Sequence, residues 1–102
     1  MAKLLILYNL APHVTDDQYQ EYVRKDKGPL MGTFSAIKKF ELTKTIESPY
    51  GKSPYKYIGI IHLRSLEDFQ KKDFPSPKFQ EMMKKWKSMV TDMQYWFADE
   101  IY

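Results

Sequence analysis

The stretch that decides the fold is YKYIGIIHL, residues Tyr55–Leu63. It is rich in β-branched and aromatic residues and follows a turn-forming segment, SPYGKSP at 48–54, so it predicts a β-strand. Successive side chains of a strand point to opposite faces of the sheet. One face carries Tyr57, Gly59, Ile61 and Leu63, and the other carries Lys56, Ile58, Ile60, His62 and Arg64. Both faces are therefore apolar at the centre of this strand.

The first apolar run, Leu4–Tyr8, has the same property. Its two sets are Leu4, Ile6 and Tyr8 against Leu5, Leu7 and Asn9. A sheet with one face in water would alternate apolar with polar residues, and neither strand does. Any face that helices leave open would then be an apolar patch, which predicts an interface or a groove. A second copy of the chain is its simplest cover.

Two helical regions separate the expected strands. A capping box at Thr15–Gln18 opens the first helix, and Gly28-Pro29 is expected to end it. A second capping box at Ser65–Asp68 opens a short helix, which Phe74–Pro77 breaks. Ser76 is expected to cap a third helix, whose apolar face includes Trp86 and runs on to Met93.

The remaining strands complete the order. Alternation predicts a long strand over 34–47, and the last strand is expected at Gln94–Ile101. The order is β, α, β, β, α (broken in two), β. It predicts one α+β domain over residues 1–102, with the ferredoxin-like βαββαβ antiparallel sheet.

The composition narrows the functional classes. The 102-residue chain has a formal net charge of +3, and its basic pairs are spread among acidic residues, as is typical of solvated faces. It has no cysteine, which excludes disulfides, thiolate metal sites and a cysteine nucleophile. Aromatic residues make up 16%, which favours a pocket or an interface. The apolar run near the N-terminus is too short for a signal peptide or a membrane span, so we expect a cytoplasmic protein with no membrane contact.

RNA-recognition motifs share this fold and are an alternative. Their strand patterns fit Leu5–Leu10 and Lys56–Leu63 in register. RNA bases stack on aromatic side chains at three positions of such sheets. This chain has Ile6, Ile58 and Ile60 there, and an aliphatic side chain offers no π-face. The pattern therefore disfavours nucleic-acid binding and favours a face covered by a partner.

The segment Tyr22–Leu30, YVRKDKGPL, resembles the helix-ending motif of the EthD-like proteins: an aromatic residue, polar residues, then His-Gly/Ala-Pro-Leu. With the layout of the chain, it resembles most closely the small REDY-like proteins of prodigiosin-type pigment biosynthesis. The family's histidine corresponds to Lys27 here. The resemblance implies a dimeric α+β barrel, in which two ferredoxin-like domains pack sheet to sheet. It also implies a cofactor-free enzyme of secondary metabolism, such as an oxygenase, isomerase or cyclase, or a ligand-binding protein.

His62 is the sharpest catalytic candidate, since a histidine can act as a general base near neutral pH. We expect Tyr8 beside it as a hydrogen-bonding partner, although His62 could instead bond across a dimer interface. His13, in the loop after the first strand, is a weaker candidate. The expected substrate is a small apolar aromatic or pyrrole-like molecule, bound without metal or cofactor. The residues predicted to contact it are Ile6, Lys27, Ile58, Ile60, Trp86 and Trp96.

The function predicted from these residues is a cofactor-independent enzyme or accessory protein of secondary metabolism, with a cyclisation or proton-transfer step. The alternative is a non-catalytic binding module that shields a hydrophobic intermediate. Both predict a homodimer.

Overall fold

A computed structural model of the chain describes all of residues 1–102. Four strands form one antiparallel sheet in the order β2-β3-β1-β4. Their bounds are Ala2–Leu10 for β1, Ile37–Lys44 for β2, Tyr57–Leu63 for β3 and Val90–Asp99 for β4. With helices between the first and second and between the third and fourth strands, this is the predicted ferredoxin-like α+β fold.

The first helical run has three parts: α1 at Asp16–Tyr22, a π-helical turn η1 at Val23–Lys27, and α2 at Gly28–Met31. Both halves of the capping box at Thr15 and Gln18 form, as predicted. The expected helix end at Gly28-Pro29 is wrong, because the run continues to Met31. The Gly28 N–H bonds to the carbonyl of Val23, five residues back, and this wider turn admits a proline where an α-helix would lose a bond.

The second helical run is broken, as predicted. It consists of α3 at Leu66–Asp68, a π-helical turn η2 at Phe69–Asp73, and α4 at Pro77–Lys87. Ser76 caps α4 by accepting a bond from the Phe79 N–H, with Pro77 at the start of the helix. At Ser65 only one half of the expected capping box forms. No helix is both long and apolar enough to cross a membrane.

The second strand is shorter than the predicted 34–47. The register shifts between Ile37 and Lys39, so Lys38 is bulged out. This puts Ile37 and Phe40 on the same face, opposite Leu63 and Ile61. Ahead of the strand, the Ala36 N–H donates to the buried Asp73 carboxylate at 2.8 Å, which fixes the start of β2 against η2.

The last strand begins before the predicted Gln94, because α4 ends at Lys87 and Val90 already pairs with Leu10. Met93 therefore lies in β4 and not on the helix. The spacing of Met89, Val90 and Met93 imitates a helical face. The backbone departs from it near Asp92, which has a φ of +57°, beside a register shift in the β1–β4 pairing.

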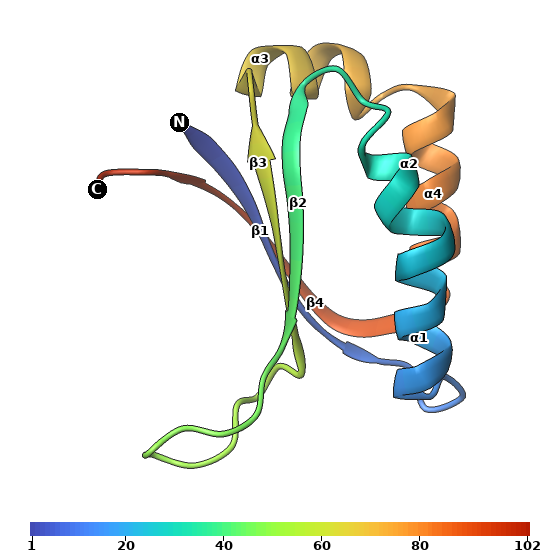
Figure 1. Cartoon of the computed structure of the whole chain (residues 1–102), viewed down its shortest axis with the longest axis vertical. Helices are drawn as coiled ribbons and strands as arrows, with labels where there is room; N and C mark the ends of the chain where they lie inside the picture. The colour runs from blue at the N-terminus through green and yellow to red at the C-terminus, as the bar shows by residue number, and fades with distance from the viewer.

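The helices α1, α2 and α4 lie along one face of the sheet, and no helix lies against the other face (Figure 1). The core fills the space between the helices and the sheet. Its fully buried side chains include Leu4, Ile6, Tyr8, Tyr19, Tyr57, Ile61, Leu63, Phe69, Phe79 and Trp86.

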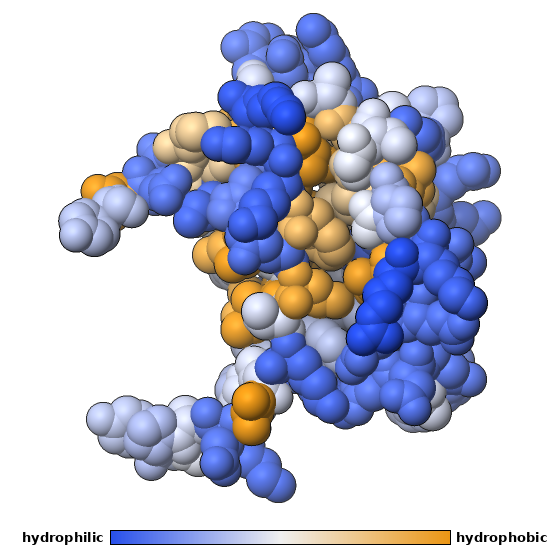
Figure 2. Space-filling view, in the orientation of Figure 1, coloured by the Kyte–Doolittle hydropathy of each residue, from blue (hydrophilic) through white to orange (hydrophobic).

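Two segments project on the helix-free side: the loop between β2 and β3, and the C-terminal end (Figure 1). We call them the two arms, residues 45–56 and 100–102. Between the arms the surface is hollowed and partly apolar (Figure 2). The arms carry four almost fully exposed large apolar side chains, Ile46, Tyr50, Ile101 and Tyr102.

Candidate functional site

The helix-free side of the sheet, which we call the open face, is set by strand register. Three rows cross it in the order β2, β3, β1, β4: Lys39, His62, Lys3, Ala98; then Glu41, Ile60, Leu5, Trp96; then Thr43, Ile58, Leu7, Gln94. The centre is apolar, and the polar residues gather in the first row, on β2 and at Gln94. This is the apolar patch predicted from the first and third strands.

His62 and Glu41 form a polar pair on the open face. His62 Nε2 lies 2.6 Å from Glu41 Oε1, and Lys39 Nζ lies 3.5 Å from the same oxygen. The hydrogen bond from His62 and the charge of Lys39 hold the pKa of Glu41 below its usual value. The contact with the Glu41 carboxylate fixes the orientation of the His62 ring through its Nε2 atom. A histidine oriented in this way is suited to proton transfer through its other nitrogen.

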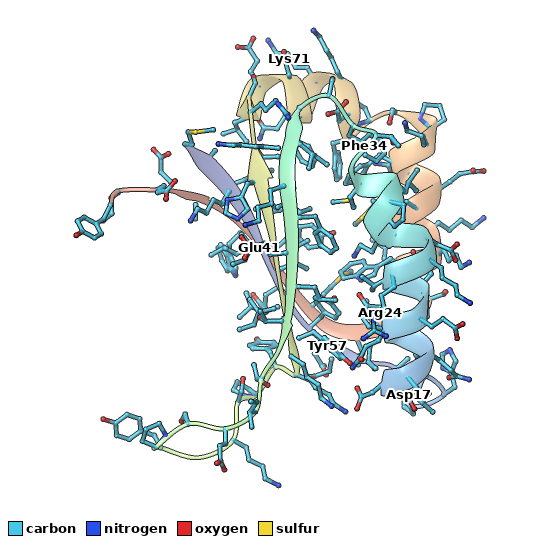
Figure 3. All side chains as sticks on the ribbon, in the orientation of Figure 1. Asp17, Arg24, Phe34, Glu41, Tyr57 and Lys71 are labelled. Atoms are coloured by element: carbon cyan, nitrogen blue, oxygen red, sulfur yellow. The ribbon has the colours of Figure 1, made fainter.

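The predicted pairing of Tyr8 with His62 is not found. Tyr8 is opposite Tyr57 in the register, whereas His62 is opposite Lys3 at the other end of the strand. Tyr8 also points to the helix side, where its hydroxyl bonds to that of Tyr19 and burial raises its pKa. Figure 3 shows Glu41 on the free side of the sheet and Tyr57 on the helix side. The register places the even-numbered residues of β1 on the same face as the odd-numbered residues of β3. Tyr8 and His62, both even-numbered, therefore point to opposite faces of the sheet.

The six residues predicted to contact substrate are divided between the two sides. Ile58, Ile60 and Trp96 lie on the open face, and Trp96 is 60% exposed. Ile6 and Trp86 are in the core, where the Trp86 indole N–H donates to the Tyr19 hydroxyl at 3.0 Å. The interpretation that grouped Ile6 with Ile58 and Ile60 is therefore wrong about the face. The sixth residue, Lys27, also lies on the helix side.

Lys27 is buried at the end of η1, with 3% of its surface exposed. Its ammonium nitrogen lies 4.6 Å from the centre of the Trp86 ring and 5.5 Å from that of Phe40. No hydrogen bond or ion pair reaches it, and burial alone lowers its pKa to about 7. The sequence showed only that a lysine replaces the family's histidine. Its burial depends on the π-helical turn, which no sequence pattern announced.

An apolar cleft of about 370 Å³, which the sequence did not predict, opens between β4, η2 and α4. Seven of its nine lining residues are apolar; they include Phe69, Phe74, Met83, Met93, Tyr95 and Phe97. Gln70 and Lys87 are the polar ones. The Tyr95 hydroxyl donates to Met83 Sδ, and burial raises its pKa, so it stays a neutral donor. The available signal in the sequence was that Tyr95 and Phe97 fall on one face of the expected last strand, and that Phe69 and Phe74 are two further aromatic residues of the broken helical run.

The other candidate, His13, is exposed in the turn after β1. No three His, Asp or Glu side chains lie close enough together to hold a metal ion.

The sequence matches the family model described as REDY-like protein HapK over residues 2–101. The chain belongs to the REDY-like HapK family. The resemblance drawn from Tyr22–Leu30 and the layout is thereby confirmed. No curated protein sequence matches the chain significantly.

Three solved structures share the fold. HapK from Hahella chejuensis is 14% identical, with 99% of this chain and 93% of that chain covered and a TM-score of 0.81. An EthD family protein from Bacillus halodurans is 18% identical, with 99% of both chains covered and a TM-score of 0.76. SnoaB, a cofactor-independent oxygenase from Streptomyces nogalater, is 9% identical, with 99% and 93% covered and a TM-score of 0.77. At these identities the likeness extends to the fold alone.

Proposed function

We propose that this protein is a small secondary-metabolism protein that binds an apolar aromatic or pyrrole-like molecule in the cleft between β4, η2 and α4. The observation that carries the proposal is the chemistry of the cleft. Its volume lies within the range of small-molecule pockets, about 300–1,000 Å³, and its walls are mostly aromatic and thioether side chains. Phe69 and Phe97 contact each other edge to face, with ring centres 6.3 Å apart and planes at 72°, and so give the cleft a continuous aromatic wall for an apolar ligand.

The cleft favours binding over chemistry. Its tyrosine stays neutral, and its other polar residues are a glutamine and a lysine near the end of α4. A site without a group that exchanges a proton near neutral pH holds a ligand but does not deprotonate it. This supports the alternative of a module that shields a hydrophobic intermediate, in a pathway of the pigment type that the family suggests.

Neighbouring residues of β4 provide a matched test. Phe97 lines the cleft, whereas Trp96 points to the open face. The probe is the neutral fluorophore phenylnaphthylamine. Phe97→Ser should weaken its binding about tenfold or more, because an aromatic side chain buried against a ligand contributes about 1 to 3 kcal/mol to the free energy of binding. Trp96→Ser should leave the affinity within about twofold. The opposite pattern would move the binding site to the open face and overturn the proposal.

We further propose that the protein is a homodimer joined through the open faces. The apolar rows of that face need a cover, and the two arms that flank it expose apolar side chains with no partner in the monomer. A protein of the same fold from Thermobifida fusca, 14% identical with a TM-score of 0.75, with 97% of this chain and 90% of that chain covered, is described as dimeric.

A second candidate function is a cofactor-independent enzyme that moves a proton, and the contact between His62 and Glu41 favours it. In the proposed dimer this pair would be enclosed beside the apolar rows, where substrate could be shielded from water. The measurement is exchange of the acidic benzylic C–H of phenylacetone, an α-aryl ketone, in deuterated water. The enzyme predicts catalysed exchange that His62→Ala abolishes without changing affinity. An uncatalysed rate with the wild-type chain would leave binding as the function.

A further inference from the structure

We propose that the Lys27 amine is a reactive site that captures an aldehyde or ketone as an imine. This goes beyond the proposed function, because Lys27 does not line the apolar cleft. Trp86 lies between Lys27 and the apolar cleft. The Lys27 nitrogen lies over the Trp86 ring, and the centre of that ring is 5.8 Å from the ring centre of Tyr95, which lines the cleft.

The first argument is the surroundings of the amine. The side chain is buried, and two aromatic rings, those of Trp86 and Phe40, lie close to its nitrogen. A lysine that serves only to stabilise a fold is normally paired with a carboxylate when it is buried. Lys27 has no such partner, and burial without an anion favours the neutral, nucleophilic amine.

The second argument is that two carboxylates lie near Lys27 and neither forms an ion pair with it. Asp26 and Glu81 line the same cleft as Lys27. Asp26 lies 3.9 Å from Lys85, and Glu81 forms no ion pair. The other charged or titratable groups around the cleft are Tyr22, from α1, and Lys78, whose ammonium donates to the Thr33 hydroxyl. Neither of these two carboxylates forms an ion pair with Lys27, although both line the same cleft.

The third argument is access. Lys27 belongs to the lining of a cleft of about 330 Å³ between the α1–α2 run and α4. Tyr22, Leu30 and Met82 give it an apolar part that could hold the body of a carbonyl compound. A small aldehyde could therefore reach the amine from this cleft.

The fourth argument is the device that places the residue. Lys27 ends the π-helical turn η1, and Gly28 follows it. A Cβ at residue 28 would lie 2.8 Å from the carbonyl oxygen of Val23, so this turn requires glycine there. The turn interrupts regular α-helical bonding, and the lysine at its end is buried. π-helical turns occur frequently at functional sites.

The reaction balances without an oxidant or a metal. The nitrogen lone pair of the neutral amine attacks the carbonyl carbon and gives a carbinolamine. The carbonyl oxygen then leaves as water with both amine hydrogens, and a C=N bond remains. The step is reversible, so hydride from cyanoborohydride is needed to trap it as a stable secondary amine.

The experiment is reductive trapping of benzaldehyde on the folded wild-type chain at pH 7 with cyanoborohydride, followed by peptide mapping by mass spectrometry. The Lys27 peptide should be labelled at least about tenfold faster than the Lys85 peptide, which serves as an exposed control from the same cleft. Lys27→Met should remove this adduct, and Lys85→Met should keep it. The N-terminal peptide is followed separately.

Labelling spread over the exposed lysines, with Lys27 unlabelled until the chain is unfolded in urea, would overturn the proposal. If Lys27→Met does not fold by circular dichroism, the wild-type peptide map alone decides, because it needs no variant. A carboxylate probe, benzoate, separates ion binding from imine formation. Binding of benzoate to the wild-type chain but not to Lys27→Met, with no benzaldehyde adduct, would show an anion site and also overturn the imine.

Discussion

His62 and Glu41 face each other across two neighbouring strands, with Nε2 2.6 Å from Oε1, on the side of the sheet that no helix covers. They are not directly opposite in the register: Glu41 pairs with Ile60, and His62 pairs with Lys39. The contact is therefore diagonal, and it draws Lys39 onto the same carboxylate. A polar triplet of this kind beside an apolar surface is the part of the open face with the clearest capacity for chemistry.

Removing the imidazole tests that contact. In His62→Ala the pKa of Glu41 should rise toward its ordinary value, because the hydrogen bond from His62 is the largest of the effects that lower it. Carboxyl-carbon NMR titration measures the change. Lys39→Met is the matched control and should raise the pKa of Glu41 less. Since the folded-state pKa of Glu41 is depressed, its contribution to stability is present above the unfolded pKa and is lost as the pH falls. An unchanged Glu41 titration in His62→Ala would show that the contact does not persist in solution.

A charge at the centre of the open face should prevent dimer formation. We expect light scattering to give the wild-type chain about twice its 12.2 kDa, and Ile60→Lys a mass near one chain. Gln80→Lys, on the exposed side of α4, adds the same charge elsewhere and should leave the mass unchanged. A wild-type chain that is monomeric at all concentrations would end the proposed sheet-to-sheet assembly.

Lys27 should make stability depend on pH in an unusual direction. Its pKa is about 7 when folded and near 10.5 when unfolded, so the unfolded chain binds more protons between these values. The destabilisation is complete below pH 7 and disappears as the pH rises through that window. Lys27→Met should thus be more stable than wild type by up to about 5 kcal/mol below pH 7, with the difference shrinking toward pH 10. Urea titrations at several pH values measure it; a difference independent of pH would contradict the buried, unpaired amine.

Two glycines of the first helical run should respond differently to alanine. Gly28→Ala places a Cβ 2.8 Å from the Val23 carbonyl oxygen and should cost about 1 to 3 kcal/mol. Gly32 has ordinary helical angles and 3.4 Å of space, so Gly32→Ala should cost nothing or gain up to about 1 kcal/mol. Thermal unfolding compares them. Equal losses would mean that the π-helical turn does not set the requirement at residue 28.

The element order and the two apolar faces of the sheet could be predicted from local pattern. Leu4–Tyr8 and Tyr55–Leu63 are short runs with large apolar residues in both of their alternating sets, a pattern typical of strands that are covered on both faces. Thr15 and Ser76 were found for a similar reason, because caps are local hydrogen bonds. These features depend on residues within one turn or one strand.

The predictions that were wrong depend on the register between strands, which a single inserted residue changes. The bulge at Lys38 interrupts the alternation from which the strand over 34–47 was predicted, and pattern alone cannot locate a bulge. Tyr8 and His62 were each interpreted correctly within their own strands, but their pairing depends on the register between strands. The apolar cleft depends on three elements that meet only in the folded chain, so no single stretch announces it.

The π-helical turn η1 amounts to one extra residue inserted in an otherwise α-helical run. The wider turn absorbs that residue, so the α-helical parts on either side keep a common face. Regular α-helical bonding of the same residues would rotate everything after the turn by about 100° relative to what precedes it. Tyr19 and Met31, both now buried, could then no longer face the sheet together. Substitutions on the exposed side of the segment should therefore be tolerated, whereas a change that straightens the turn into an α-helix of the same length should not.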